Sequence, residues 1–194
     1  MPSVSRQIPP KAATQFPTGS VLASAVPVSS LVESKINLCI YGRNRSGKTT
    51  LAAMIAQAAM KRTGKPSLII SAEPDENGGA LSITDVGCIS ITRITPPNKS
   101  IPGDKVRGSA KVVAVANELA TSNPFAWVFL DTVTSLQDVV LVELMGLSKV
   151  PEMLSWGMVP EGVYQQRAEK LRETIRPLLD LKNCCVGILA QEKD

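Results

Sequence analysis

Eight consecutive residues have the types and spacing of a loop that holds phosphate groups. They run from Gly42 to Thr49 in the pattern G-x-x-x-x-G-K-T, after an apolar segment and before a helix-favouring one. Glycines at both ends let the backbone wrap until its N–H groups point at phosphates, and the following helix adds the positive end of its dipole. In this pattern Lys48 reaches the β and γ phosphates, and the Thr49 hydroxyl ligates Mg²⁺.

The pattern predicts a complete contact set for a nucleotide, with ATP and Mg²⁺ as cofactors. A glycine-rich turn that only joins a strand to a helix is the alternative, and it leaves the lysine and the threonine at fixed offsets unexplained. The two arginines inside the loop either add affinity for phosphate or are simply exposed. The residues predicted to contact the nucleotide are Gly42, Arg43, Asn44, Arg45, Ser46, Gly47, Lys48, Thr49 and Thr50.

An aspartate follows the apolar run 127–130. We expect this run to be the strand beside the phosphate loop. Its terminal Asp131 then joins Thr49 in ordering the Mg²⁺ shell. On its own the pattern is weak, because many strands end in Asp at a turn.

Two further polar residues follow predicted strands. Glu73 follows the apolar run 68–72, and at the carboxyl edge of a parallel sheet it faces the nucleotide crevice, where it can act as general base toward water. A solvated loop acid beside Pro74 is the alternative. Gln191 follows the run 186–190, and its amide can sense the γ-phosphate. For Gln191 a polar strand terminus is the alternative.

Short apolar runs alternate with longer helical stretches after residue 35, which predicts parallel strands covered by helices. The expected fold is an α/β three-layer sandwich with a mainly parallel sheet. The predicted strands are 36–41, 67–71, 88–94, 127–130 and 186–190, and the predicted helices are 48–62, 109–121, 133–145 and 161–181.

Composition limits the remaining possibilities. Residues 1–34 are rich in Pro and Ser, which predicts a flexible tail before a single domain at 35–194. The net charge of +4 permits a polyanionic partner without naming one. Four cysteines without histidine or CxxC spacing argue against zinc, so Cys184 and Cys185 are expected to be free thiols. No apolar run is long enough for a membrane span, and we expect a cytoplasmic protein.

Taken together, these motifs resemble the RecA-type ATPase core, in particular the compact RecA-like, AAA-annotated ATPases encoded by many bacteriophages. The resemblance covers about residues 35–194. It rests on the phosphate loop, on Ala72-Glu73 at the end of one strand, on Asp131-Thr132 at the end of another, and on Gln191 at the end of the last.

The resemblance implies further features of the site. Glu73, Lys48 and Gln191 are the implied catalytic residues, and homo-oligomerisation is implied because such sites are completed between subunits. About residues 146–162 would occupy the place of a first DNA-contacting loop, and a second loop would begin after Gln191. The core therefore looks truncated at its C-terminus. Trp156 would be available for stacking on bases, whereas Trp127 is expected in the core.

The expected function is ATP binding and hydrolysis in DNA recombination, repair or single-strand annealing, with single-stranded DNA as a partner and no membrane association. The alternatives are a P-loop small-molecule kinase, for which no cluster of lid arginines is evident, and a nucleotide-binding module without turnover or DNA activity. A GTPase-like switch lacks its N/T-K-x-D base-reading motif here.

Overall fold

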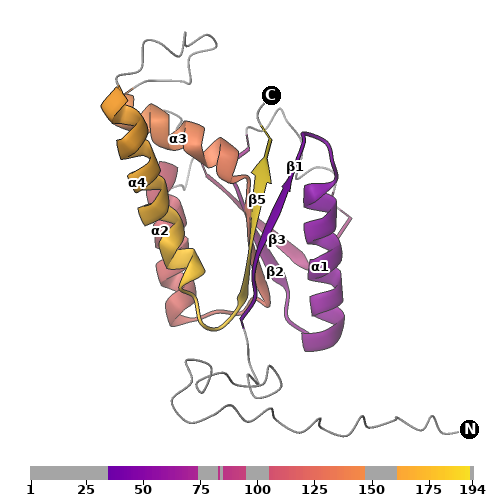
Figure 1. Cartoon of the computed structure of the whole chain (residues 1–194). Coiled ribbons are helices and arrows are strands. Elements are labelled where there is room, and N and C mark those ends of the chain that lie inside the picture. Colours follow the sequence, from indigo (N-terminus) through magenta and orange to yellow (C-terminus); the bar gives the residue numbers. More distant parts are fainter. Residues whose placement is uncertain (1–34, 74–82, 84, 95–104, 147–160, 193–194) are drawn as a thin grey trace, which may run out of the picture. The chain divides into compact units, whose positions relative to one another are not determined.

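The computed structural model describes most of the chain from Lys35 onward (Figure 1). The described residues are 35–73, 83, 85–94, 105–146 and 161–192. The chain divides into two units, Met1–Ser34 and Lys35–Asp194, and all the described residues belong to the second. The flexible tail predicted for 1–34 lies outside the described residues.

Five strands form one all-parallel sheet in the order β1-β5-β4-β2-β3. Of the three strands flanked by others on both sides, β2 and β4 are buried at every position because helices cover both faces of the sheet, and this explains their continuous apolar sequences. The bounds are β1 (Asn37–Gly42), β2 (Ser67–Ser71), β3 (Ile89–Arg93), β4 (Trp127–Asp131) and β5 (Cys185–Gln191). All five predicted strands are confirmed, with shifts of at most one residue at their ends.

Strand β4, which ends at Asp131, does not pair with β1, because β5 lies between them. Gly187 of β5 pairs with Phe129 of β4, and a Cβ atom on Gly187 would lie 2.3 Å from Phe129 Cδ1. The bare glycine therefore makes room for the aromatic ring of its neighbour. The sequence runs alone do not show which strands pair.

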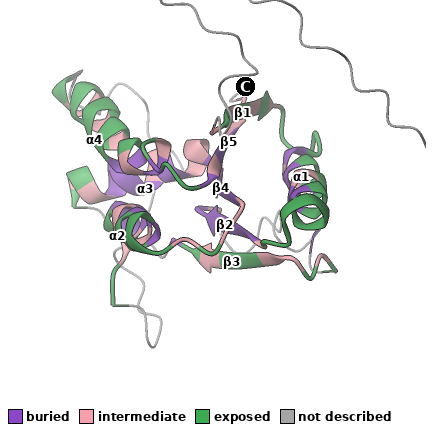
Figure 2. Cartoon of the chain, turned by 90° about the horizontal axis from the view of Figure 1, so that it is seen from below, coloured by how far each residue is buried: buried purple, intermediate pink, exposed green. Residues whose placement is uncertain are grey.

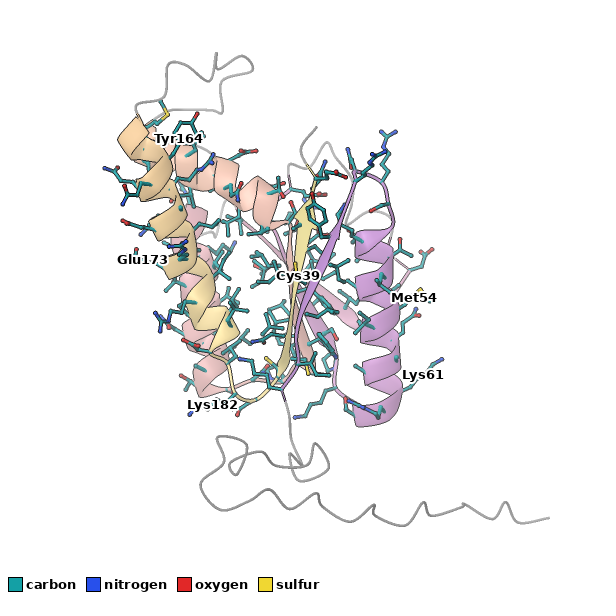
Figure 3. The ribbon with its side chains drawn as sticks, in the orientation of Figure 1. Cys39, Met54, Lys61, Tyr164, Glu173 and Lys182 are labelled. Carbon is teal, nitrogen blue, oxygen red and sulfur yellow. The ribbon has the colours of Figure 1, made fainter. Side chains whose placement is uncertain are left out.

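Helix α1 (Lys48–Thr63) covers one face of the sheet. Its buried face consists of Ala52, Ala53, Ala56 and Ala59, small side chains that pack with Ile69, Phe129 and Leu189 of the sheet. Met54 and Lys61 lie on the other side of the helix and project away from the sheet (Figure 3). The helix ends at Gly64, whose φ of 71° provides a left-handed cap.

Three helices cover the opposite face: α2 (Gly108–Thr121), α3 (Val133–Met145) and α4 (Glu161–Leu179). Their apolar side chains form a second core with β2, β4 and β5, so the described chain has three layers (Figure 2). Helix α4 ends two residues before the predicted 181, where Lys35 Nζ donates to the Leu179 carbonyl. Glu143 of α3 closes the start of α2 by accepting hydrogen bonds from Ser109 N and Ser109 Oγ, both at 2.6 Å.

Because all strands are parallel, their carboxyl ends meet at one edge of the sheet. The residues at the ends of β1, β2, β4 and β5 and just after them are brought together there, and they include the phosphate loop, Glu73, Asp131 and Gln191. Among the described helices, none has both the length and the apolar character that a membrane crossing requires.

Candidate functional site

The loop between β1 and α1 is compact, and its backbone explains the two glycines. Ser46 N donates to the Arg43 carbonyl at 3.3 Å, and Arg45 and Gly47 both have positive φ, 59° and 83°. A Cβ on Gly42 would lie 2.8 Å from Ser46 Oγ. Gly47 is therefore needed for its backbone conformation, and Gly42 for the close approach of Ser46.

Lys48 turns its side chain back into this loop. Only 9% of its surface is exposed, and Nζ donates to the carbonyls of Gly42 at 3.1 Å and Arg43 at 2.6 Å. An ammonium has three N–H donors, so one remains for another acceptor. The first turn of α1 contains no acidic residue and its N-cap, Gly47, offers no side chain. A buried cation beside an uncapped helix N-terminus is an environment that favours an anion.

Thr49 and Asp131 meet at the edge of the sheet. Thr49 Oγ1 donates to Asp131 Oδ2 at 2.8 Å, although the two residues are 82 positions apart. The contact forms because the first turn of α1 lies over the end of β4. Both residues are predicted from the sequence to hold Mg²⁺, and the structure places them in direct contact.

Asp131 also has an unused oxygen. The residue is 2% exposed, and its Oδ1 is a buried atom with no hydrogen-bond partner among the described residues. Burial raises the pKa of Asp131, while the Thr49 hydrogen bond and the Lys48 charge act in the opposite direction.

This arrangement fits a divalent cation of the Mg²⁺ type. Mg²⁺ is normally held by one or two protein oxygens together with phosphate oxygens and water, and does not need a cage of protein ligands. Among the described residues there is no group of three or more His, Cys, Asp and Glu side chains that could form such a cage. The buried Oδ1 atom and the Thr49 hydroxyl are the oxygens that this chain offers.

Glu73 lies at the same edge, two residues beyond the end of β2. Ser71 pairs with Asp131 across the sheet, and Ala72 N donates to the Asp131 carbonyl at 2.7 Å. Glu73 is half-buried and follows directly. The register thus places it beside the segment that carries Asp131, and its role as general base stays a prediction.

Gln191 is the last residue of β5 and pairs with Gly42 at the start of the loop. Its backbone is held by Thr134, whose Oγ1 accepts from Gln191 N at 2.9 Å and donates to Gln191 O at 3.1 Å. The next residue, Glu192, donates its N–H to the Gly42 carbonyl at 3.1 Å.

Sequence reasoning missed both Thr134 and Glu192. For Thr134 the only signal is a hydroxyl three positions after Asp131, and that signal does not reveal its partner. Arg43 Nε donates to Glu192 Oε2 at 3.3 Å, with most of the arginine side chain in solvent. Besides Arg43, the loop positions Asn44, Arg45, Ser46 and Thr50 are also exposed.

Other predictions divide into those that can be checked and those that fall outside the described residues. Trp127 is buried and stacks on Phe129 with ring centroids 5.3 Å apart, so its assignment to the core is confirmed. Cys184 and Cys185 are free thiols, as expected, and burial raises the pKa of Cys184. Trp156, nearly all of the segment 146–162 and the loop after Gln191 lie outside the described residues.

No protein-family model matches the chain, and a search of curated proteins finds no match. The structure has an α/β fold, with a five-stranded parallel sheet between helical layers.

Proposed function

We propose that this chain is a RecA-like P-loop ATPase that binds ATP and Mg²⁺ at the edge of its sheet. Water cleaves the bond between the β and γ phosphates, which gives ADP and phosphate. The single observation that carries the proposal is the meeting of Thr49 with Asp131 at 2.8 Å, with Asp131 Oδ1 buried and without a partner. Lys48, enclosed by the Gly42–Thr49 loop, adds the positive charge that phosphates require.

Each residue has a role that follows from its chemistry. The loop N–H groups and the Lys48 ammonium bind the phosphates, while Thr49 and Asp131 hold Mg²⁺. The metal supplies charge neutralisation on the phosphate oxygens during transfer. Glu73 accepts a proton from the attacking water, and Gln191 responds to the presence of the γ-phosphate.

A role on single-stranded DNA is the further part of the proposal. Its support is the resemblance of the motifs to the RecA-type core and the net charge of +4. Recombination, repair and strand annealing are the processes in which such nucleotide-controlled binding is used. Assembly of several copies around the nucleotide belongs to the same proposal.

The test is ATP hydrolysis by the full chain, with and without single-stranded DNA, for the wild type and Glu73→Gln. Removing a general base lowers the rate by about 10²- to 10⁴-fold. We expect ATP affinity to remain in the variant, because glutamine keeps the size of the side chain. Equal hydrolysis rates in the two proteins would refute the role of Glu73, and a rate that DNA leaves unchanged would refute the DNA part of the proposal.

A further inference from the structure

Strand β5 extends beyond the end of its neighbour β4. Asp131, the last residue of β4, pairs with Leu189, whereas β5 continues to Gln191. Cys185 N donates toward β4, to Ala126 O, and Val186 N donates toward β1, to Ile36 O. Since the direction alternates along a strand, the N–H and C=O of Gln191 point toward the β4 side, where the strand has already ended.

Thr134 takes the place of the missing strand residue. Its hydroxyl, in the first turn of α3, accepts from the N–H of Gln191 at 2.9 Å and donates to its carbonyl at 3.1 Å. One side chain thus satisfies both backbone groups of Gln191. Without it, the end of β5 would have hydrogen bonds only on the β1 side.

On that other side, the end of β5 touches the phosphate loop. Gln191 pairs with Gly42, Glu192 N donates to the Gly42 carbonyl at 3.1 Å, and the Glu192 carboxylate pairs with Arg43. Residues 191–192 therefore lie between the helix that follows Asp131 and the loop proposed to hold phosphate.

We infer that Thr134 is a positioning residue, which fixes the end of β5 so that Gln191 can respond to the γ-phosphate. The inference rests on the proposed function. Strand ends open at low free energy when their hydrogen bonds are lost, and a mobile Gln191 cannot distinguish ATP from ADP by a fixed contact. Thr134 itself touches neither phosphate nor metal in this scheme.

The test compares Thr134→Val, which keeps the shape without the hydroxyl, with Thr134→Ser, which keeps the hydroxyl. Thr121→Val is the matched control, since Thr121 is exposed and donates only to Asn117 of its own helix. Thr134→Ala serves if the valine variant unfolds. Each protein is assayed for ATP and ADP affinity, for kcat, and for amide hydrogen exchange at Gln191 without nucleotide.

In Thr134→Val we expect ATP affinity within about twofold of the wild type but kcat lower by about tenfold, as for a misplaced group. Exchange at Gln191 should rise by about fivefold, the factor for one lost hydrogen bond. Thr134→Ser should restore kcat and amide exchange to the wild-type values, and Thr121→Val should leave ATP affinity, kcat and exchange unchanged.

Wild-type kcat and wild-type exchange in Thr134→Val would overturn the inference, as would a serine variant as impaired as the valine variant. Failure of the proposed function looks different, because the wild type itself would then bind no ATP. The role of Thr134 would fall with it.

Discussion

Asp131 is a carboxylate in a place where burial disfavours its charge. Its pKa is raised, mainly by desolvation, so the folded protein favours the protonated form more than the unfolded chain does. This contribution to stability is fully present below the ordinary aspartate pKa of about 3.9 and is lost as the pH rises through the raised value in the folded state. At neutral pH the charged group therefore lowers the free energy of unfolding.

Asp131→Asn should consequently stabilise the protein while removing the metal-dependent chemistry that we propose for it. Asparagine keeps an oxygen that can accept from Thr49 and carries no charge. We expect the free energy of unfolding in urea at pH 7 to rise, because the variant no longer buries a charge at this position. The gain should vanish near pH 3, where the wild-type carboxyl is protonated in both states. A variant less stable than the wild type at pH 7 would contradict this reading of the site.

Among the elements, β5 contains a small residue that its neighbouring strand requires. Gly187 faces Phe129, and a Cβ atom there would lie 2.3 Å from the ring. Phe129 cannot easily move away, because it is fully buried and stacks on Trp127.

Gly187→Ala should therefore push β5 away from β4 and destabilise the protein. Overpacking of this kind costs about 2 kcal/mol. Gly162 on α4 is the control: it is exposed, and a Cβ atom there meets nothing within 4 Å. Gly162→Ala should be neutral or slightly stabilising, since alanine favours a helix. Urea unfolding of both variants checks the prediction, and equal stabilities would show that the sheet has room at position 187.

The helices and strands are the features of the fold that could best be predicted from the sequence. Continuous apolar runs identified β2 and β4, and helical spacing identified α4, because local patterns reflect burial on one or both faces. The order of strands was not predictable in the same way. The position of β5 between β1 and β4 depends on pairings between residues more than fifty positions apart, such as Phe129 with Gly187.

In the candidate site, too, local sequence patterns could be predicted and contacts between distant residues could not. The residues from Gly42 to Thr49 are contiguous, so their types could be interpreted together. Asp131 was predictable because it follows an apolar run that is typical of a strand. Thr134 carried no such signal, because its partner Gln191 is 57 positions away. A hydroxyl in the first turn of a helix usually caps that turn, and only the three-dimensional structure shows that this one bonds to a strand.

At the scale of the whole molecule, the three layers bring four chain segments to one edge of the sheet. The segment after β1 supplies the loop and Lys48, the segment after β2 supplies Glu73, β4 ends at Asp131, and β5 ends against the loop. We propose that this edge of the sheet binds ATP together with Mg²⁺.

The most direct test is calorimetric titration of ATP into the full chain, with and without Mg²⁺, for the wild type, Lys48→Ala and Lys61→Ala. Lys61 lies at the far end of the same helix and is exposed, so it matches the change in charge without touching the loop (Figure 3). Thermal unfolding of each variant shows whether it is folded. We predict Mg²⁺-dependent binding by the wild type and by Lys61→Ala, and none by folded Lys48→Ala. If the wild type does not bind ATP in the presence of Mg²⁺, or if Lys48→Ala binds ATP as tightly as the wild type, this edge is not the ATP site.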